Sequence, residues 1–396
     1  MSSINPCEPG PVTASRTASL AAVFCATMGV GLIFGFQPPL LALVLSRQGE
    51  SSFAIGAVTS ISTLAVIGLA PFYPAIIARF GPRLTIVAGI GISVASLLVM
   101  PYLTALHGWM TLRLVTGCAL GLAWIASEVW LNLLSEDESR SMVMGIYTTA
   151  FATGVMSGPL LLQLTGSEGA RPFYVGAVCL AATAVPLLFS RDVSRVEHDS
   201  QRKQPLRGLL RVAPIAMLAA LIAGLVESTD ISLLPVFGLR RGLGESAALT
   251  LVTVFLVGNV LLQLPISSLA DRFGRTRILA VCAAASVIGP LLLDSSMSSP
   301  WLLWPLLLVW GGTMYGFYTQ GIALLGDSYP PKDLAAANSV FIVVYCLGGL
   351  VGPGLGGVAM DWWTPYGLVA FLSCVPLLLA LPLLASAARS LQRPRK

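Results

Sequence analysis

The sequence predicts an all-α polytopic membrane protein whose twelve transmembrane helices form two pseudo-symmetric six-helix bundles. Three observations support this prediction: the composition, the number of long apolar runs, and short motifs that recur after about 193 residues. The chain has 396 residues, of which 56% are hydrophobic and 10% are charged. Soluble domains carry about 25% charged residues, so a soluble globular class is excluded.

Twelve apolar runs reach the length of about 20 residues that a helix needs to cross the hydrocarbon core. An even number of crossings places both termini on one side of the membrane. The runs cover residues 18–43, 54–77, 84–105, 109–131, 142–164, 172–190, 212–236, 247–268, 278–296, 301–325, 338–358 and 367–388.

Basic residues near the span ends predict the orientation, because Lys and Arg accumulate on the cytoplasmic side. With both termini inside, eighteen of the 23 basic residues are cytoplasmic, and four, Arg47, Arg171, Arg240 and Arg241, are outside. We therefore expect a multi-pass protein of the cytoplasmic (inner) membrane with both termini cytoplasmic.

The long polar segment 191–211 separates the first six runs from the last six. We expect an N-terminal half over residues 1–190, a cytoplasmic linker over 191–211 and a C-terminal half over 212–396. We interpret the linker as a solvated basic segment that fixes the topology rather than as a regulatory element.

A charged segment, 267–277, lies between the eighth and ninth runs and reads Ser-Ser-Leu-Ala-Asp-Arg-Phe-Gly-Arg-Thr-Arg. Each arginine would cost about 2.5 to 3.5 kcal/mol in hydrocarbon, so the segment must form a turn outside the bilayer. Gly274 provides the backbone freedom for that turn.

Motifs of the first half recur in the second half at nearly constant offsets, which indicates two parallel six-helix repeats. The pairs are Arg79-Phe80-Gly81 and Arg272-Phe273-Gly274 at an offset of 193, Gly154 to Pro159 and Gly348 to Pro353 at 194, and Thr116 to Gly121 and Gly311 to Gly316 at 195.

The segment 267–277 resembles the loop signature of the major facilitator superfamily, Gly-x-Leu-Ala-Asp-Arg-x-Gly-Arg, with Ser267 in place of the leading Gly. Residues 113–117, 124–128 and 233–236 are similar to YcaD-type bacterial members. The resemblance implies a membrane transporter with a small-molecule substrate, and not an enzyme. We expect it to act as a monomer in the lipid bilayer.

In this family the loop is part of a cytoplasmic gate. The resemblance implies that Asp271 contacts the amino end of the fifth span, near Arg140 and Ser141, where free N–H groups favour an anion. It also implies that Arg272 pairs with a carboxylate of residues 136–138. The alternative is that these charges only hold the turn in water.

The first copy of the loop has Ala78 in place of the Asp, so Asp271 would be the main anchor of the gate. In the first copy, two arginines would instead pair with Asp327 or Asp333. The gate candidates are Asp271, Arg272, Gly274, Arg275, Arg79, Gly81 and Arg83.

The fifth span resembles the antiporter signature that is typical of proton-coupled exporters. Gly145, Gly154, Gly158 and Pro159 match it, whereas Leu162 stands where the signature ends in Gly. Glycines at helical spacing also let a neighbouring helix approach closely, and a proline kinks a helix. Close packing with no bearing on the direction of transport is therefore the alternative interpretation.

Two charged residues of the fourth span are candidates for transport. Arg113 precedes Gly117 by four residues, as the family's span-four Arg does, and an intramembrane Arg is costly unless it faces a polar cavity or partner. The alternative is that Arg113 snorkels to the outer interface. Glu128 lies near the inner end of the span, as a proton or substrate site or as part of an interfacial ion pair.

Glu227 and Asp230 are three residues apart and share one face of the seventh span. A pair of nearby carboxylates in a membrane suits a group that binds and releases a proton during a transport cycle. We expect Glu227 to face the cavity and Asp230 to lie at the outer rim. A solvated span end without function is the alternative.

Other polar and aromatic residues inside the spans are candidates for lining a central cavity, because mid-span polar groups need partners there. These residues are Gln37, Trp124, Tyr147, Asn259, Gln263, Trp310, Tyr315, Tyr318, Gln320 and Tyr345. Taken singly, each aromatic residue also fits a packing role. Together they favour an amphipathic organic substrate over a bare inorganic ion.

The sequence contains no Walker-type phosphate loop and no His/Cys/carboxylate cluster with metal-ligand spacing. We therefore expect no cofactor and no metal, a proton gradient as the driving force, and no nucleic-acid partner. The sequence predicts proton-coupled efflux (antiport) of a small organic or amphipathic solute by alternating access. Proton-coupled uptake and a transporter-like membrane sensor are the alternatives.

Overall fold

Helices make up almost all of the chain that the structure describes. A computed structural model of the protein describes residues 11–135, 140–190 and 212–392. The helices are α1 (Pro11–Arg47), α2 (Ser52–Leu69), α3 (Tyr73–Phe80), α4 (Pro82–Val99), α5 (Leu106–Leu134), α6 (Arg140–Thr165), α7 (Arg171–Leu188), α9 (Pro214–Arg240), α10 (Glu245–Phe273), α11 (Arg275–Ser296), α12 (Pro300–Ser328), α13 (Pro331–Trp362) and α14 (Tyr366–Gln392).

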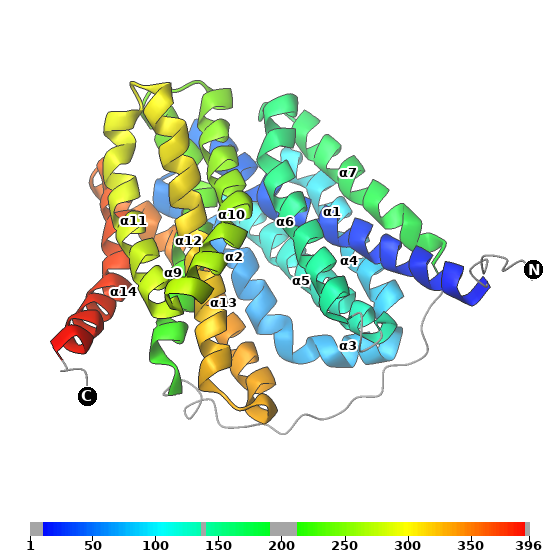
Figure 1. The fold of residues 1–396 in the computed structure, drawn as a ribbon. Helices are drawn as coiled ribbons and strands as arrows, with labels where there is room; N and C mark the ends of the chain where they lie inside the picture. The colour runs from blue at the N-terminus through cyan, green and yellow to red at the C-terminus, as the bar shows by residue number, and fades with distance from the viewer. Residues whose placement is uncertain (1–10, 136–139, 191–211, 393–396) are drawn as a thin grey trace, which may run out of the picture.

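Each of the twelve predicted runs corresponds to a helical segment. The second run contains α2 and α3, which the 3₁₀ turn Ala70–Phe72 joins. Ten segments among the described residues are long and apolar enough to cross a membrane. The helices α6 and α12 fall outside those ten, and both carry glycine and tyrosine among their apolar residues. Both helices nevertheless run alongside their neighbours in the bundles (Figure 1).

The helices form two bundles with the same internal packing (Figure 1). In the first bundle α1 packs on α6, α5 packs on α2 and α4, and α7 packs on α4. In the second bundle α9 packs on α13, α12 packs on α10 and α11, and α14 packs on α11. This equivalence confirms the two-fold helical repeat that the motif offsets predict. The predicted linker, 191–211, lies outside the described residues, as do residues 136–139.

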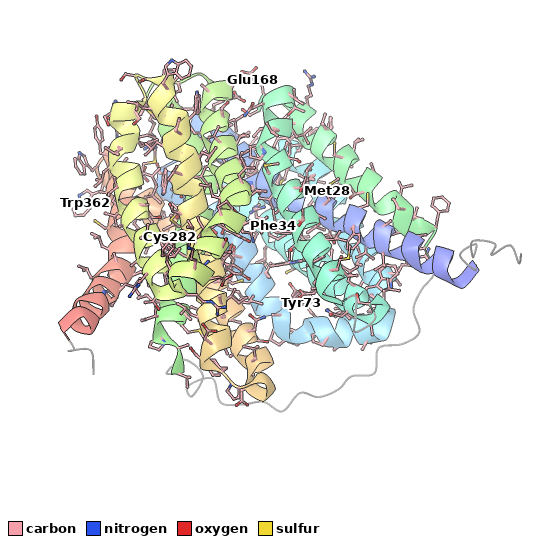
Figure 2. All side chains as sticks on the ribbon, in the orientation of Figure 1. Met28, Phe34, Tyr73, Glu168, Cys282 and Trp362 are labelled. Atoms are coloured by element: carbon pink, nitrogen blue, oxygen red, sulfur yellow. The ribbon has the colours of Figure 1, made fainter. Side chains whose placement is uncertain are left out.

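Glycines at equivalent positions let the first and fifth helices of each bundle approach closely. A side chain at Gly154 or Gly158 of α6 would collide with the backbone of α1, near Met28 and Gly35 respectively. Figure 2 marks Met28 on α1. Gly348 and Gly352 of α13 meet the backbone of α9 in the same way. Close packing thus accounts for these glycines in both halves.

The two repeated turns also have the same backbone geometry. Gly81 links α3 to α4 with φ of 80°, and Gly274 links α10 to α11 with φ of 96°. Only glycine adopts such values at little cost. The prediction that Gly274 permits the turn is therefore confirmed.

The two bundles contact each other at one end of the molecule, which we call the closed face. This face carries the connections 48–51, 166–170 and 241–244, and Glu168 marks it in Figure 2. Arg47 of α1 forms an ion pair with Glu245 of α10. The amide of Gln163 in α6 donates a hydrogen bond to the Thr253 hydroxyl of α10 at 3.1 Å.

A carboxylate of the second bundle caps a helix of the first bundle at the closed face. The Asp361 oxygens, near the end of α13, accept hydrogen bonds from the backbone N–H groups of Ser52 and Phe53, each at 2.9 Å. The first N–H groups of a helix have no partner within the helix and carry partial positive charge. Asp361 also lies 3.6 Å from the Arg240 guanidinium of its own bundle. We call this contact the Asp361 latch.

At the opposite end, which we call the open face, the polar contacts of Arg275 and Arg83 stay within their own bundles. Arg275 contacts Asp327 at 2.7 Å and Asp271 at 4.0 Å, all in the second bundle. Arg83 donates to the carbonyl of Leu188 in the first bundle at 2.6 Å. In this conformation Asp327 therefore pairs with Arg275, and the predicted pairing of Asp327 with a first-bundle arginine is not made.

Gly154→Ala is expected to destabilise the protein by about 1 to 3 kcal/mol, because its Cβ would overpack the contact between α6 and α1. Gly145→Ala is the matched control, since the space around Gly145 is open. Both changes gain the same helix propensity, so their difference isolates the packing effect. Thermal unfolding of the purified protein in detergent measures the difference. Equal melting temperatures for the two variants would contradict this account of Gly154.

Asp361→Asn is expected to weaken the closed face by about 1 to 2 kcal/mol, because an amide caps the helix without the charge. That loss shifts the ratio of closed to open conformations at this face by roughly five- to thirtyfold. Spin labels at Gln48 and Ser298, in a variant without native cysteines, measure the distance between the two bundles at this face. In Asp361→Asn, a larger fraction of molecules should show a long distance between the labels.

Asp294→Asn is the control for the latch. Asp294 pairs with Arg241 at 2.6 Å on the same face, and both residues belong to the second bundle. The same loss of charge there should leave the distance between the labels unchanged. If the two variants gave the same distance distribution, Asp361 would have no role in holding the bundles together.

Candidate functional site

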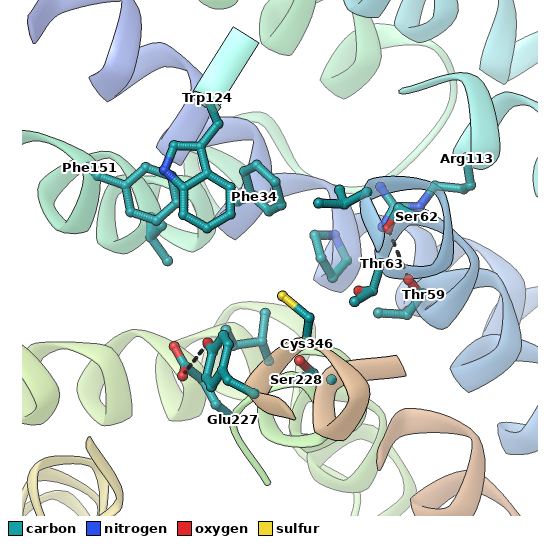
Figure 3. A pocket seen from close by; sticks show the side chains of 16 residues that line it. Phe34, Thr59, Ser62, Thr63, Arg113, Trp124, Phe151, Glu227, Ser228 and Cys346 are labelled. Atoms are coloured by element: carbon teal, nitrogen blue, oxygen red, sulfur yellow. Dashed lines mark hydrogen bonds between the residues drawn. The ribbon is translucent and has the colours of Figure 1, made fainter. Parts of the chain in front are cut away.

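A cavity lies between the two bundles and has walls from both. It encloses about 160 Å³. Helices α1, α2, α5 and α6 form one wall, and α9 and α13 form the other (Figure 3). The lining residues are Phe34, Pro38, Thr59, Ser62, Thr63, Val66, Arg113, Trp124, Phe151, Val155, Glu227, Ser228, Ile231, Tyr345, Cys346 and Gly349.

Arg113 of α5 is the basic residue of this lining and is only 4% exposed. Its guanidinium donates hydrogen bonds to the amide oxygen of Gln37 in α1, to the Ser62 hydroxyl in α2 at 2.5 Å, and to the Val58 carbonyl in α2 at 3.4 Å. Gln37 is itself fully buried. The alternative that Arg113 snorkels to the interface is therefore wrong, because two neighbouring helices hold the guanidinium inside the bundle.

Three aromatic rings form an apolar wall within the lining to which Arg113 also belongs. Trp124 of α5 and Phe151 of α6 stack with ring centroids 5.5 Å apart and an interplanar angle of 12°. Phe34 of α1 meets the Trp124 ring edge-on at 6.0 Å. Figure 3 shows these rings on the same side of the cavity as Arg113, across from Glu227. We call the three residues the aromatic wall.

Glu227 of α9 is the carboxylate of the cavity lining. The hydroxyl of Tyr345 in α13 donates a hydrogen bond to its Oε2 at 2.8 Å. Glu227 also lines a second cavity of about 50 Å³ together with Asn259 and Tyr315. A space of that size is large enough for water, since a cavity of about 10 to 15 Å³ on this measure can hold one molecule. Glu227 therefore faces two separate spaces from which it can exchange a proton.

Asp230 lies elsewhere than predicted. We expected it at the outer rim of the seventh span, but its exposure is 0%. Neither carboxylate oxygen has a hydrogen-bond partner among the described residues. The reason is the position of α9, which packs against α10, α12, α13 and α14 of its own bundle and against α1 and α2 of the other. The alternative of a solvated span end is wrong for the same reason.

Six other predicted residues lie outside the lining of these two cavities: Glu128, Tyr147, Gln263, Trp310, Tyr318 and Gln320. Glu128 is partly buried in α5, and Tyr147 and Gln320 are buried. Tyr318 packs among aromatic side chains, stacked on Tyr315 at 5.8 Å. The cavities thus bring together Arg113, Trp124, Glu227, Asn259, Tyr315 and Tyr345 from the predicted set, with Gln37 behind Arg113.

Several lining residues were not predicted from the sequence. Thr59, Ser62 and Thr63 belong to a run of hydroxyl residues, Thr-Ser-Ile-Ser-Thr, inside an otherwise apolar span. That clustering is a signal that could have identified them. Phe34 and Phe151 carry no comparable signal, because an isolated phenylalanine in an apolar run predicts packing equally well.

A family model for the Major Facilitator Superfamily matches residues 20–251 and 242–396. The chain belongs to this superfamily. It is therefore a multi-pass membrane transporter and not an enzyme, as predicted, and the predicted fold class is confirmed.

Two relatives of this superfamily transporter cover almost the whole chain. It is 24% identical over 349 residues to the MFS-type transporter YfkF of Bacillus subtilis, covering 87% of this chain and 89% of the relative. It is 22% identical over 379 residues to YcaD of Salmonella enteritidis, with 94% and 97% covered. These matches agree with the resemblance of its fourth and seventh spans to YcaD-type members.

Solved structures share the fold at low sequence identity. The nucleoside transporter NupG, in a mutant form, matches with a TM-score of 0.80 and 14% identity over 93% of this chain and 99% of that one. A bacterial homologue of the human lysosomal transporter Spinster, in an inward-facing and unoccupied conformation, matches with a TM-score of 0.70 and 16% identity, with 96% of both chains covered. At these identities the likeness concerns the fold alone.

Proposed function

We propose that this transporter couples the export of a small organic, amphipathic solute to proton entry, by alternating access to the cavity between its bundles. The observation that carries the proposal is the position of Glu227 in the cavity lining, with a hydrogen bond from Tyr345. A titratable group in a cavity that opens to one side at a time can load a proton on one side and release it on the other. No cofactor is needed for this cycle.

Glu227 is preferred over the other predicted carboxylates because a proton carrier that is coupled to the solute must line the cavity that holds the solute. Glu227 faces both cavities, whereas Asp230 has no exposed surface in this conformation. Glu128 lies outside both cavities. We therefore assign the proton to Glu227 and regard Asp230 as a second carboxylate behind it on the same helix.

The charge distribution supports a cytoplasmic position for both termini and the open face. The open face holds the turns at Gly81 and Gly274, and the basic residues of those turns belong to the predicted cytoplasmic set. With this orientation the open face points to the cytoplasm, and the Asp361 latch lies on the outer side. Asp271 then lies on the open side, where its predicted contact with the first bundle would form only after that side closes.

The preference for export rests on the resemblance of Gly145, Gly154, Gly158 and Pro159 to the antiporter signature. Proton-coupled uptake is the second candidate, and one observation favours it. Arg113 and Glu227 line the same cavity, so a solute anion held by Arg113 would bind more tightly when Glu227 carries a proton. Cotransport requires that the solute and the proton bind to the same conformation together.

Glu227→Gln is expected to reduce transport driven by a pH gradient at least tenfold, because the amide cannot carry a proton. Exchange of labelled for unlabelled solute needs no proton and should continue. The measurement is solute flux in proteoliposomes, with solutes that raise the melting temperature of the purified protein. Everted membrane vesicles energised to an acidic interior then give the direction, since accumulation indicates export.

Glu128→Gln is the matched control, because it makes the same change outside both cavities. It should leave gradient-driven flux and exchange unchanged. Loss of coupling in Glu128→Gln, or gradient-driven flux that survives in Glu227→Gln, would refute the assignment of the proton to Glu227. Binding of a solute without any flux would favour the membrane sensor.

Asp271→Asn is expected to favour the conformation open to the cytoplasm, because the contact that we propose for the closed state loses its charge. Cys346 lines the cavity and reports this change when the other cysteines are replaced. An impermeant thiol reagent applied to everted vesicles should label Cys346 several-fold faster. Asp294→Asn is the control, because it removes a charge at the closed face, where its partner Arg241 belongs to the same bundle. An unchanged labelling rate in Asp271→Asn would argue against the gate.

A further inference from the structure

We infer that the cavity between the bundles binds an organic anion with one aromatic ring, its anionic group on Arg113 and its ring against the aromatic wall. The inference rests on the proposed transport function, because it names the class of solute for the same cavity. It holds for export and for uptake alike.

The first step is the unbalanced charge of Arg113. Its three hydrogen-bond acceptors are an amide oxygen, a hydroxyl and a backbone carbonyl, and all three are neutral. Within the described part of the chain, no carboxylate lies within ion-pair distance of this guanidinium. Glu227, the carboxylate of the cavity lining, accepts its hydrogen bond from Tyr345. A buried charge without an opposite charge costs several kcal/mol. An anion in the cavity would remove that cost.

The second step concerns the remaining donors of Arg113. A guanidinium has five N–H groups. Three of them are used by Gln37, Ser62 and Val58, one from each nitrogen. One N–H group on each terminal nitrogen is left. Two such donors are what a carboxylate accepts in a bidentate ion pair, and the planar guanidinium is suited to that geometry.

The third step is the size and chemistry of the remaining space. The rings of the aromatic wall already pack on one another in stacked and edge-on arrangements. Aromatic pairs prefer these two arrangements, so a further ring can pack against the wall in the same way. The cavity volume of about 160 Å³ is close to that of a cavity of about 150 Å³ that binds benzene in another protein. One ring therefore fits in this conformation. In Figure 3 the three rings and Arg113 lie along the same wall, with other lining side chains between Phe34 and Arg113.

The group that would bind the anion and the rings that would bind the aromatic part of the solute both belong to the first bundle. Arg113 and Trp124 belong to α5, and the other two rings belong to α1 and α6. An aromatic carboxylate such as benzoate would therefore contact one rigid wall with its ring and its carboxylate. A neutral ring would leave Arg113 unbalanced, and an aromatic ammonium would be repelled by it.

The test compares three matched probes on the purified protein in detergent: benzoate, benzamide and benzylammonium. Binding is measured by the shift in melting temperature and by tryptophan fluorescence at constant ionic strength. We expect benzoate to bind at least tenfold more tightly than benzamide, and benzylammonium not to bind. An aliphatic carboxylate, butyrate, should bind more weakly than benzoate because it lacks the ring.

The decisive variant is Gln37→Glu. Its carboxylate replaces the amide oxygen that already accepts from Arg113, so it neutralises the guanidinium in place. The preference for benzoate over benzamide should be lost, while the melting temperature without ligand should not fall. Ser62→Asp places a carboxylate on the other terminal nitrogen and serves as a second variant if the first does not fold. Gln48→Glu makes the same change on the exposed surface and should keep the preference.

Trp124→Leu tests the ring separately. It should weaken benzoate binding several-fold and leave butyrate binding unchanged. Tighter binding of benzamide or benzylammonium than of benzoate would overturn the inference, as would a benzoate preference that survives both carboxylate variants. An absence of any response to millimolar benzoate would also overturn it. These measurements need no membrane or gradient, so they fail or succeed independently of proton coupling, which the flux of Glu227→Gln tests.

Discussion

A positive charge within the hydrocarbon layer must be solvated by the protein itself, and in this transporter that requirement fixes the centre of the first bundle. Arg113 of α5 is held by Gln37 of α1 and by Ser62 and Val58 of α2. Each of these groups is neutral, so they satisfy the hydrogen bonds of the guanidinium without cancelling its charge. The position of the cavity and its electrostatic character both follow from this arrangement, since the guanidinium is part of its wall.

The requirement for close helix packing acts in parallel with this electrostatic one. The glycines of α6 that resemble an antiporter signature contact the backbone of α1, and glycines at equivalent positions of α13 contact α9. Because both bundles use the same device, packing is sufficient to explain these positions. Packing does not explain Gly145, the remaining glycine that matches the signature, because it faces open space.

The spans, the repeat and the burial of Arg113 with polar partners could be predicted from the sequence, because each follows from a strong physical rule. Apolar length sets the spans, motif offsets reveal the repeat, and an intramembrane Arg demands partners. The rotation of each helix follows from no such rule, as it depends on the packing against all neighbours. For this reason Asp230 is buried although it was predicted at the rim, and Gln320 lies outside the cavity lining. Asp361 has no sequence signal of this kind, because its role depends on its contact with α2 of the other bundle.

The Asp361 latch has a consequence for affinity. It lies at the closed face and shares no residue with the cavity lining, so its strength sets how often each conformation occurs without altering a contact to the solute. The affinity measured from one side is the intrinsic affinity scaled by the fraction of molecules that are open to that side. A single carboxylate far from the bound solute can therefore adjust the working concentration range of the transporter, while its selectivity stays the same.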